Sequence, residues 1–167
     1  MLRTVLSHPA MGLISRLVLA GVWGYAGFTK IFEPGGARLA IIAYRIDFIN
    51  PFASFLGYAV PIIEIIIAVT LLFGIFVRYS AAISGALLIM FIVAIAQVWA
   101  RGYSIDCGCF GGGGDVDPAG KDARYIAELA RDFLFLGFSA ILFVWPRTPF
   151  SLLPERENVP DESKDDE

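Results

Sequence analysis

Long apolar runs separated by short polar breaks dominate the pattern of residues along this chain. Four of these runs cover residues 11–32, 55–77, 80–100 and 125–145. An α-helix rises about 1.5 Å per residue, so roughly 20 apolar residues cross the hydrocarbon core of a bilayer, which is about 30 Å thick. The pattern therefore predicts an all-α fold, an integral membrane four-helix bundle in contact with lipid.

Breaks in the apolar pattern predict how the first three helices are connected. The Glu-Pro-Gly-Gly sequence at residues 33–36 ends the first helix, because proline and glycine punctuate helices. Residues 38–51 mix apolar and charged side chains, as an interfacial segment or a short loop helix would. Only Arg78 and Tyr79 separate the second run from the third, so these two helices are expected to form a tight antiparallel hairpin.

The fourth helix has its own start and stop signals. Asp117 and Pro118 come before it, as a cap and a proline at the first helical position would, and Pro146 follows its end. Aromatic residues lie where a belt at the membrane surface is expected, at Trp99, Tyr103, Tyr125 and Trp145.

Composition supports a membrane protein with one domain. The 167 residues are 57% hydrophobic and 17% charged, and the mean hydropathy is +0.68. A water-soluble domain of this size could not bury so much apolar surface. We expect one domain at residues 11–146, an N-terminal tail at 1–10 and an acidic, disordered tail at 147–167 that supplies most of the net charge of −3. Because Lys and Arg are scattered, the sequence argues against a nucleic-acid partner.

The two cysteines of the chain, Cys107 and Cys109, lie in the loop before the fourth helix. A disulfide across one intervening residue departs from relaxed geometry, and strained disulfides are easily reduced. Gly108 gives the backbone the freedom to close such a ring, and the glycines at 111–114 are expected to leave the sulfurs accessible to a partner. Asp106 works against the pair, because a neighbouring carboxylate disfavours a thiolate.

Three interpretations of this pair are open. A metal site usually needs four ligands, and the single histidine, His8, is far away in the sequence, so no metal is expected. The thiols are inert if they only fill space in a glycine turn. The favoured interpretation is redox chemistry, in which Cys107 and Cys109 form the catalytic pair of a thiol-disulfide oxidoreductase.

Redox chemistry also predicts an orientation in the membrane. Disulfides persist in oxidising compartments, so the cysteine loop is expected outside the cytoplasm and both termini inside it, in a multi-pass protein of the plasma membrane. The Lys and Arg residues are nearly balanced between the two sides and do not choose between them.

Charged residues inside the apolar runs are the second candidate site. A carboxylate in hydrocarbon is costly unless it is paired or faces a cavity. Glu64 is the clearest case, with Lys30 or Arg131 as its expected partner, and Asp132 continues the polar face of the fourth helix one turn beyond Glu128. These residues predict either structural ion pairs that align the bundle or a proton relay.

Three short motifs carry a resemblance to a known family. They are Gly-x-x-Lys-x-x-x-Pro from Gly27 to Pro34, Pro-x-x-Glu at Pro61 and Glu64 followed by Gly74, and Cys-Gly-Cys-Phe-Gly from Cys107 to Gly111. With these motifs, residues 11–145 resemble the MauE family, which belongs to the wider DoxX-like group of four-helix membrane proteins. The resemblance implies a role beside a thioredoxin-like dithiol partner in making or maintaining disulfides outside the cytoplasm. The family is named after methylamine utilisation, but the substrate need not carry over to this chain.

The plan of four helices with cysteines near the membrane surface is also similar to the quinone-linked vitamin K epoxide reductase type. This chain lacks a second cysteine pair to relay electrons, so no cofactor is evident, and quinone is a possible cofactor that the sequence does not support. The function expected is therefore a membrane thiol-disulfide component, in which one cysteine forms a mixed disulfide and the other resolves it. The alternative is a noncatalytic assembly or scaffold subunit of a larger respiratory or maturation complex.

Overall fold

The computed structural model describes residues 8–146 and 148–152. Most of the predicted N-terminal tail and most of the predicted acidic tail lie outside these described residues. Residues 9 and 10, which were assigned to the N-terminal tail, belong to the first described helix.

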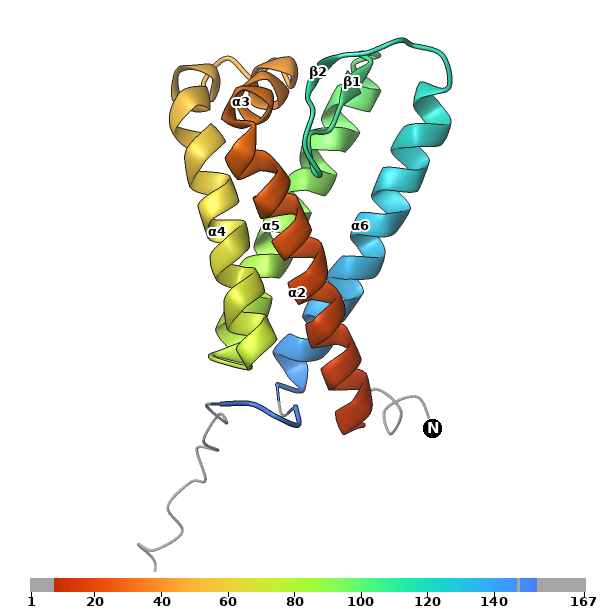
Figure 1. Cartoon of the computed structure of the whole chain (residues 1–167). Coiled ribbons are helices and arrows are strands. Elements are labelled where there is room, and N and C mark those ends of the chain that lie inside the picture. Colours follow the sequence, from red (N-terminus) through yellow and green to blue (C-terminus); the bar gives the residue numbers. More distant parts are fainter. Residues whose placement is uncertain (1–7, 147, 153–167) are drawn as a thin grey trace, which may run out of the picture.

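Four long helices run along the molecule (Figure 1). They are α2 (Pro9–Phe32), α4 (Ala53–Phe73), α5 (Val77–Ala100) and α6 (Lys121–Val144). One further α-helix, α3 (Pro34–Ala43), and the short 3₁₀ helix η1 (Asn50–Phe52) lie at one end of the bundle. The strands β1 (Ile105–Asp106) and β2 (Gly114–Asp115) form a small antiparallel hairpin at that same end.

The fold is all-α and of the membrane type. Within the described residues, three helices are long and apolar enough to cross a bilayer, at Pro9–Phe32, Asn50–Phe73 and Val77–Ala100. They expose large apolar side chains on their outer faces, as a lipid-facing surface does. Helix α6 also has 24 residues, but its first half is charged and it does not meet the same criterion.

The connections between helices differ from the predicted ones. Helix α3 begins directly after α2, because Pro34 suits the first helical position, and so the predicted interfacial segment begins earlier than residue 38. The turn between α4 and α5 lies at residues 74–76, and the prediction of a turn at Arg78 and Tyr79 was wrong. Gly74 has a φ of 66° and ends α4, so α5 begins early enough to include both residues.

The predicted start of the fourth helix was also wrong. Asp117 and Pro118 lie in a turn before α6, where Asp117 Oδ1 accepts a hydrogen bond from the Ala119 amide at 2.8 Å. The helix itself begins at Lys121, directly after Gly120, whose φ of 71° lies in the left-handed region. A short polar side chain bonded to the backbone two residues on is typical of a turn, and it competes with helix capping.

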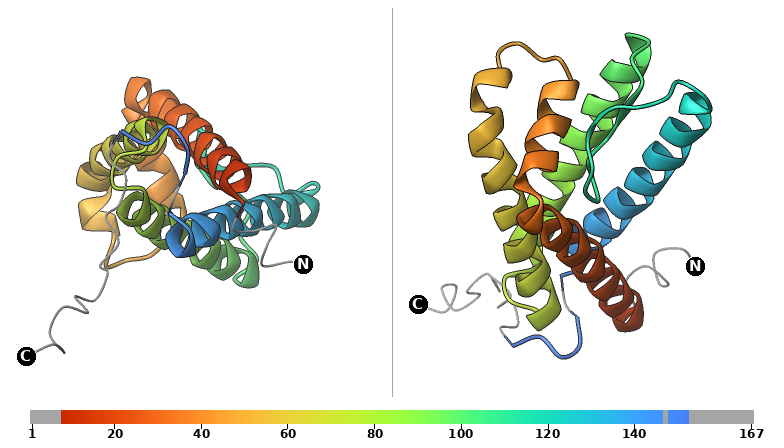
Figure 2. Two further views of the ribbon diagram at one scale, coloured as in Figure 1. Left: turned by 90° about the horizontal axis from the view of Figure 1, so that it is seen from below. Right: turned by 45° about the horizontal axis from the view of Figure 1, so that its top comes forward.

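A solid core holds the bundle together at the end opposite the hairpin. Leu19, Leu71 and Leu142 are fully buried there. The indole N–H of Trp23 donates to Ser84 Oγ at 2.7 Å, and Ser84 is in turn bonded to Ser139, which links α2, α5 and α6. Toward the other end α6 diverges from α2, and the hairpin loop occupies the space between α6 and the other helices (Figures 1 and 2). This divergence creates the place where the cysteines lie.

Candidate functional site

The cysteine loop folds back into the helix bundle. In the hairpin Ile105 pairs with Asp115, and Cys107 and Cys109 follow at its inner tip. Both thiols are free and buried, with exposed fractions of 9% and 6%. The prediction that the glycine run leaves the sulfurs accessible was therefore wrong.

The glycines allow a close approach between the loop and α3. Gly113 has a φ of 135°, and a Cβ atom there would lie 2.6 Å from Ala40 Cβ and 2.7 Å from the Gly36 carbonyl oxygen. A Cβ on Gly36 would in turn meet the Gly112 carbonyl oxygen at 3.1 Å. A Cβ on Gly108 would also collide with Ala40. The glycine run thus packs the loop against α3 and covers the sulfurs.

Two buried tyrosines fix the loop backbone. The Tyr44 hydroxyl donates to the Cys107 carbonyl oxygen at 2.9 Å, and the Tyr125 hydroxyl accepts from the Ile105 amide at 2.9 Å. Tyr125 is 1% exposed, so its predicted place in a surface aromatic belt was wrong. Tyr44 was not predicted from the sequence, because nothing local marks a tyrosine whose partner is 63 residues away.

The environment of the two thiols makes them unequal. The Cys109 amide donates to Cys107 Sγ at 3.3 Å. A hydrogen bond from the Cys109 thiol lowers the pKa of Cys107 below its usual value, and desolvation opposes this effect. The same hydrogen bond and burial raise the pKa of Cys109 well above its usual value. Cys107 is therefore the thiol that ionises first and is the better nucleophile.

Charges on α6 act on this pair from one side. Glu128 raises the pKa of Cys107 and Arg131 lowers it, although both effects are smaller than the hydrogen bond from Cys109. The carboxylate that opposes the thiolate is thus Glu128, whereas Asp106 was predicted. Asp106 Oδ1 instead accepts from the amide that follows Cys107, at 2.9 Å, and shapes the tip of the loop.

Phe110 connects the cysteine loop to two helices. Its ring lies 5.8 Å from the Tyr25 ring, centroid to centroid, and the Arg131 guanidinium lies 4.5 Å from its centroid. Arg131 also pairs with the adjacent Asp132, at 2.9 Å between Nη2 and Oδ1. Arg131 is therefore not the partner of Glu64, which was one of the two expected possibilities.

The partner of Glu64 is Lys30. Lys30 Nζ lies 2.5 Å from Glu64 Oε1, and the two residues are 4% and 0% exposed. The helices cross closely here, because a Cβ on Gly27 would lie 3.0 Å from the Pro61 carbonyl oxygen and 3.2 Å from Glu64 Cβ. The Gly-x-x-Lys and Pro-x-x-Glu motifs thus meet at one crossing of α2 and α4, where small residues let the backbones approach.

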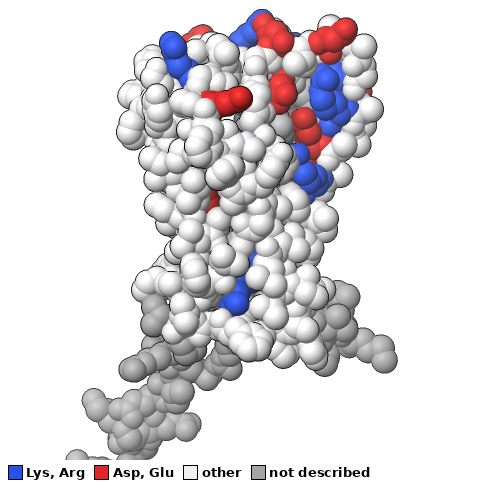
Figure 3. Space-filling model, viewed as in Figure 1, with Lys and Arg blue, Asp and Glu red and all other residues white. Residues whose placement is uncertain are grey.

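The four intramembrane residues singled out from the sequence therefore form two separate pairs. Lys30 and Glu64 join α2 to α4, while Arg131 and Asp132 stay together on α6. On the face shown in Figure 3, most charged side chains gather at the hairpin end, and the body of the molecule below it shows few of them.

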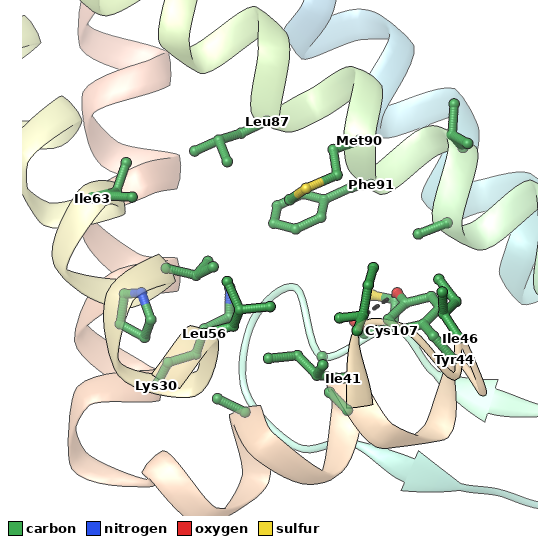
Figure 4. A pocket seen from close by; sticks show the side chains of 18 of the residues that line it. Lys30, Ile41, Tyr44, Ile46, Leu56, Ile63, Leu87, Met90, Phe91 and Cys107 are labelled. Carbon is green, nitrogen blue, oxygen red and sulfur yellow. Dashed lines mark hydrogen bonds between the residues drawn. The ribbon is translucent and has the colours of Figure 1, made fainter. Parts of the chain in front are cut away.

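A cavity of about 580 Å³ lies beside the cysteine loop. Helices α3, α4 and α5 form most of its wall, and nearly all of the wall is apolar. Polar groups reach it from Lys30, Tyr44, Gln97 and Cys107. In Figure 4, Lys30 and Cys107 lie on opposite sides of the cavity. The volume and the mainly apolar lining are typical of a small-molecule site, so these residues are the ones that could hold a cofactor. Within the described part of the chain, no group of three or more His, Cys, Asp and Glu residues is placed to hold a metal ion.

Comparison with known proteins gives one match. No curated protein and no solved structure matches this chain. The family model described as "Methylamine utilisation protein MauE" matches residues 8–146, which include both the Lys30–Glu64 crossing and the cysteine loop. This match confirms the family that the sequence motifs predicted. The chain belongs to the MauE family of methylamine utilisation membrane proteins.

Proposed function

We propose that this protein is a membrane thiol-disulfide component that acts with a thioredoxin-like dithiol protein in protein maturation outside the cytoplasm. The observation that carries the proposal is the hydrogen-bonded pair of Cys107 and Cys109 with its unequal thiols. A thiolate beside a protonated thiol is the arrangement that stepwise thiol exchange requires.

The exchange takes place in two steps. The Cys107 thiolate attacks a sulfur of the partner's disulfide, which forms a mixed disulfide and expels one partner thiolate. Cys109 then loses its proton and attacks Cys107 Sγ, which forms the Cys107–Cys109 disulfide and releases the second partner thiolate. Both steps are reversible, so the same pair also oxidises a partner dithiol by the reverse route.

Burial of the sulfurs adds a requirement to this mechanism. Thiols that are 9% and 6% exposed cannot meet the cysteine of another protein unless the loop tip moves. The loop is attached mainly through backbone packing on α3 and the hydroxyls of Tyr44 and Tyr125. Docking of the partner at the hairpin end therefore has to displace this tip.

Trapping the mixed disulfide tests the exchange. The probe is a purified thioredoxin with a single active-site cysteine, activated as its thionitrobenzoate disulfide. Cys109→Ala should release thionitrobenzoate and accumulate a stable mixed disulfide, whereas Cys107→Ala should react far more slowly. Equal, slow reaction of both variants would contradict the proposal.

The proposed topology places both termini in the cytoplasm, the cysteine loop outside and the protein in the plasma membrane, with α6 as a fourth crossing. The start of α2 and the end of α6 lie at one end of the bundle and the cysteine loop lies at the other (Figure 1). This arrangement supports the proposed topology. The test uses a Cys107→Ser/Cys109→Ser background with Ala119→Cys, which sits in an exposed turn. A membrane-impermeant maleimide should label this cysteine in intact cells, and labelling only after permeabilisation would reverse the topology.

Burial of both thiols favours a second candidate, a noncatalytic scaffold subunit of a larger membrane complex. In that case the loop is a rigid docking surface whose cysteines only fill space. The Cys107→Ser/Cys109→Ser protein distinguishes the two candidates. A scaffold keeps its complex assembled and its client oxidised with both serines present, whereas a thiol-disulfide component loses client oxidation.

A further inference from the structure

The cavity beside Cys107 lies between the cysteine loop, α3, the first half of α4 and the second half of α5. Its wall combines apolar side chains of α4 and α5 with Lys30, and Cys107 closes it on the loop side (Figure 4). Cavities of about 300–1,000 Å³ with few polar groups bind organic molecules, and this one is about 580 Å³.

The rim of the cavity faces lipid. Its lining includes Ile63 of α4 and Met90 and Val93 of α5, which are 37%, 47% and 59% exposed. Both helices are among those apolar enough to span a bilayer. A molecule dissolved in the hydrocarbon phase can therefore enter this cavity past these side chains.

Of the four polar residues on the wall, Lys30 and Cys107 are able to engage such a molecule. The other two already donate hydrogen bonds within the protein. The Tyr44 hydroxyl donates to the Cys107 carbonyl oxygen, and Gln97 Nε2 donates to the Tyr44 carbonyl oxygen. Lys30 donates one hydrogen bond to Glu64, and an ammonium group has three donors. Lys30 and Cys107 therefore offer a cationic donor and a reactive sulfur on opposite sides of one apolar space (Figure 4).

A thiol pair that repeatedly oxidises partners must pass its electrons on. The chain has two cysteines, so no second pair relays them. The acceptor has to react at Cys107 and Cys109 themselves, and the cavity gives a lipid-soluble acceptor a route to Cys107 that does not cross the partner's docking side. A phospholipid acyl chain would fit the apolar wall but accepts no electrons.

We propose that this cavity binds a lipid-soluble quinone that reoxidises Cys107 and Cys109. The inference rests on the proposed thiol-disulfide function. The two thiols lose two electrons and two protons and form one S–S bond, and the quinone gains both electrons and both protons and leaves as the quinol. Lys30 donates a hydrogen bond to a quinone carbonyl oxygen and stabilises the negative charge that gathers there during reduction.

The test uses the full-length protein in nanodiscs, with its thiols reduced and the reductant removed, under anaerobic conditions. Decylubiquinone is added, quinol is followed by ultraviolet absorbance, and the thiols are counted by mass spectrometry after alkylation. One quinol should form for each Cys107–Cys109 disulfide. Val93→Trp fills the rim of the cavity, and Ile89→Trp is its control, because Ile89 is 52% exposed on the same helix but does not line the cavity.

Val93→Trp should slow quinol formation by about tenfold or more, which corresponds to roughly 1.4 kcal/mol of lost binding, and Ile89→Trp should leave it unchanged. Both variants should still react with the activated thioredoxin at the wild-type rate. Equal quinone reaction in all three proteins, or quinone binding without disulfide formation, would overturn the cavity proposal. If quinone oxidises the pair but thioredoxin never reacts, the proposed partner is wrong and the quinone site stands.

Discussion

Neutralising Glu64 tests whether the buried ion pair holds the bundle together. Glu64→Gln keeps the shape of the side chain but removes its charge. Lys30, which is 4% exposed, would then keep a buried ammonium group without its counter-ion. Removing one partner of a buried pair costs about 3–5 kcal/mol, because the remaining charge is left uncompensated. This cost corresponds to at least about a hundredfold change in the ratio of folded to unfolded protein.

A double-mutant cycle separates the effect of the ion pair on stability from the effect of the side-chain shapes. Lys30→Met removes the unpaired ammonium group, so Lys30→Met/Glu64→Gln should recover at least about 2 kcal/mol relative to Glu64→Gln alone. Unfolding is followed by circular dichroism during titration of the purified protein in mild detergent with sodium dodecyl sulfate. The control is Asp115→Asn, which breaks the exposed pair with Arg45 and should leave the midpoint unchanged. A wild-type midpoint for Glu64→Gln, or a double variant no more stable than it, would refute the reasoning.

Three further predictions concern the cysteine loop. Gly113→Ala should push the loop off α3 and speed alkylation of the thiols several-fold. The control is Gly114→Ala, because Gly114 also has a positive φ but a Cβ there would meet nothing within 4 Å. Equal alkylation rates in the two variants would contradict the packing of the loop on α3. Cys109→Ala removes the hydrogen bond that lowers the pKa of Cys107, so the pH midpoint of Cys107 alkylation should move to higher pH, and an unmoved midpoint would show that the bond has no effect. Tyr125→Phe leaves a buried amide without its acceptor and should cost about 1–3 kcal/mol in the same unfolding assay, and wild-type stability would exclude that role.

Local patterns predict much of the helical fold. Hydrogen bonds within a helix are local and lipid contact needs long apolar runs, so the apolar pattern alone locates α2, α4 and α5 to within a few residues. The turns were harder to predict. The Gly74 turn was missed because the apolar run continues past Gly74 to residue 77, so the apolar pattern does not mark the end of α4. The start of α6 was missed because Asp117 and Pro118 resemble a helix start, whereas the helix follows the left-handed Gly120.

The Lys30–Glu64 pair shows which features of the site are predictable. An apolar environment forces a buried carboxylate to find a partner, and few basic residues occur in the apolar runs, so the sequence reduces the choice to two. Burial of the cysteines could not be predicted in this way. It depends on contacts of Gly113 with α3 and on the Tyr44 hydroxyl, which are distant in sequence and carry no local signal. A glycine-rich loop is equally compatible with an open tip and with close backbone packing.

The crossing of α2 and α4 gives Lys30 two roles that do not compete. Close packing at Gly27 and Pro61 brings the two helix backbones together, and Glu64 accepts one hydrogen bond from the Lys30 ammonium group. That bond fixes the position of Lys30, whose side chain lines the cavity, so its other donors are already placed when a ligand arrives. A donor that is held in place before binding costs little entropy to use. The same ion pair that stabilises the bundle therefore also orients the one positive charge on the wall of the proposed quinone site in the described structure.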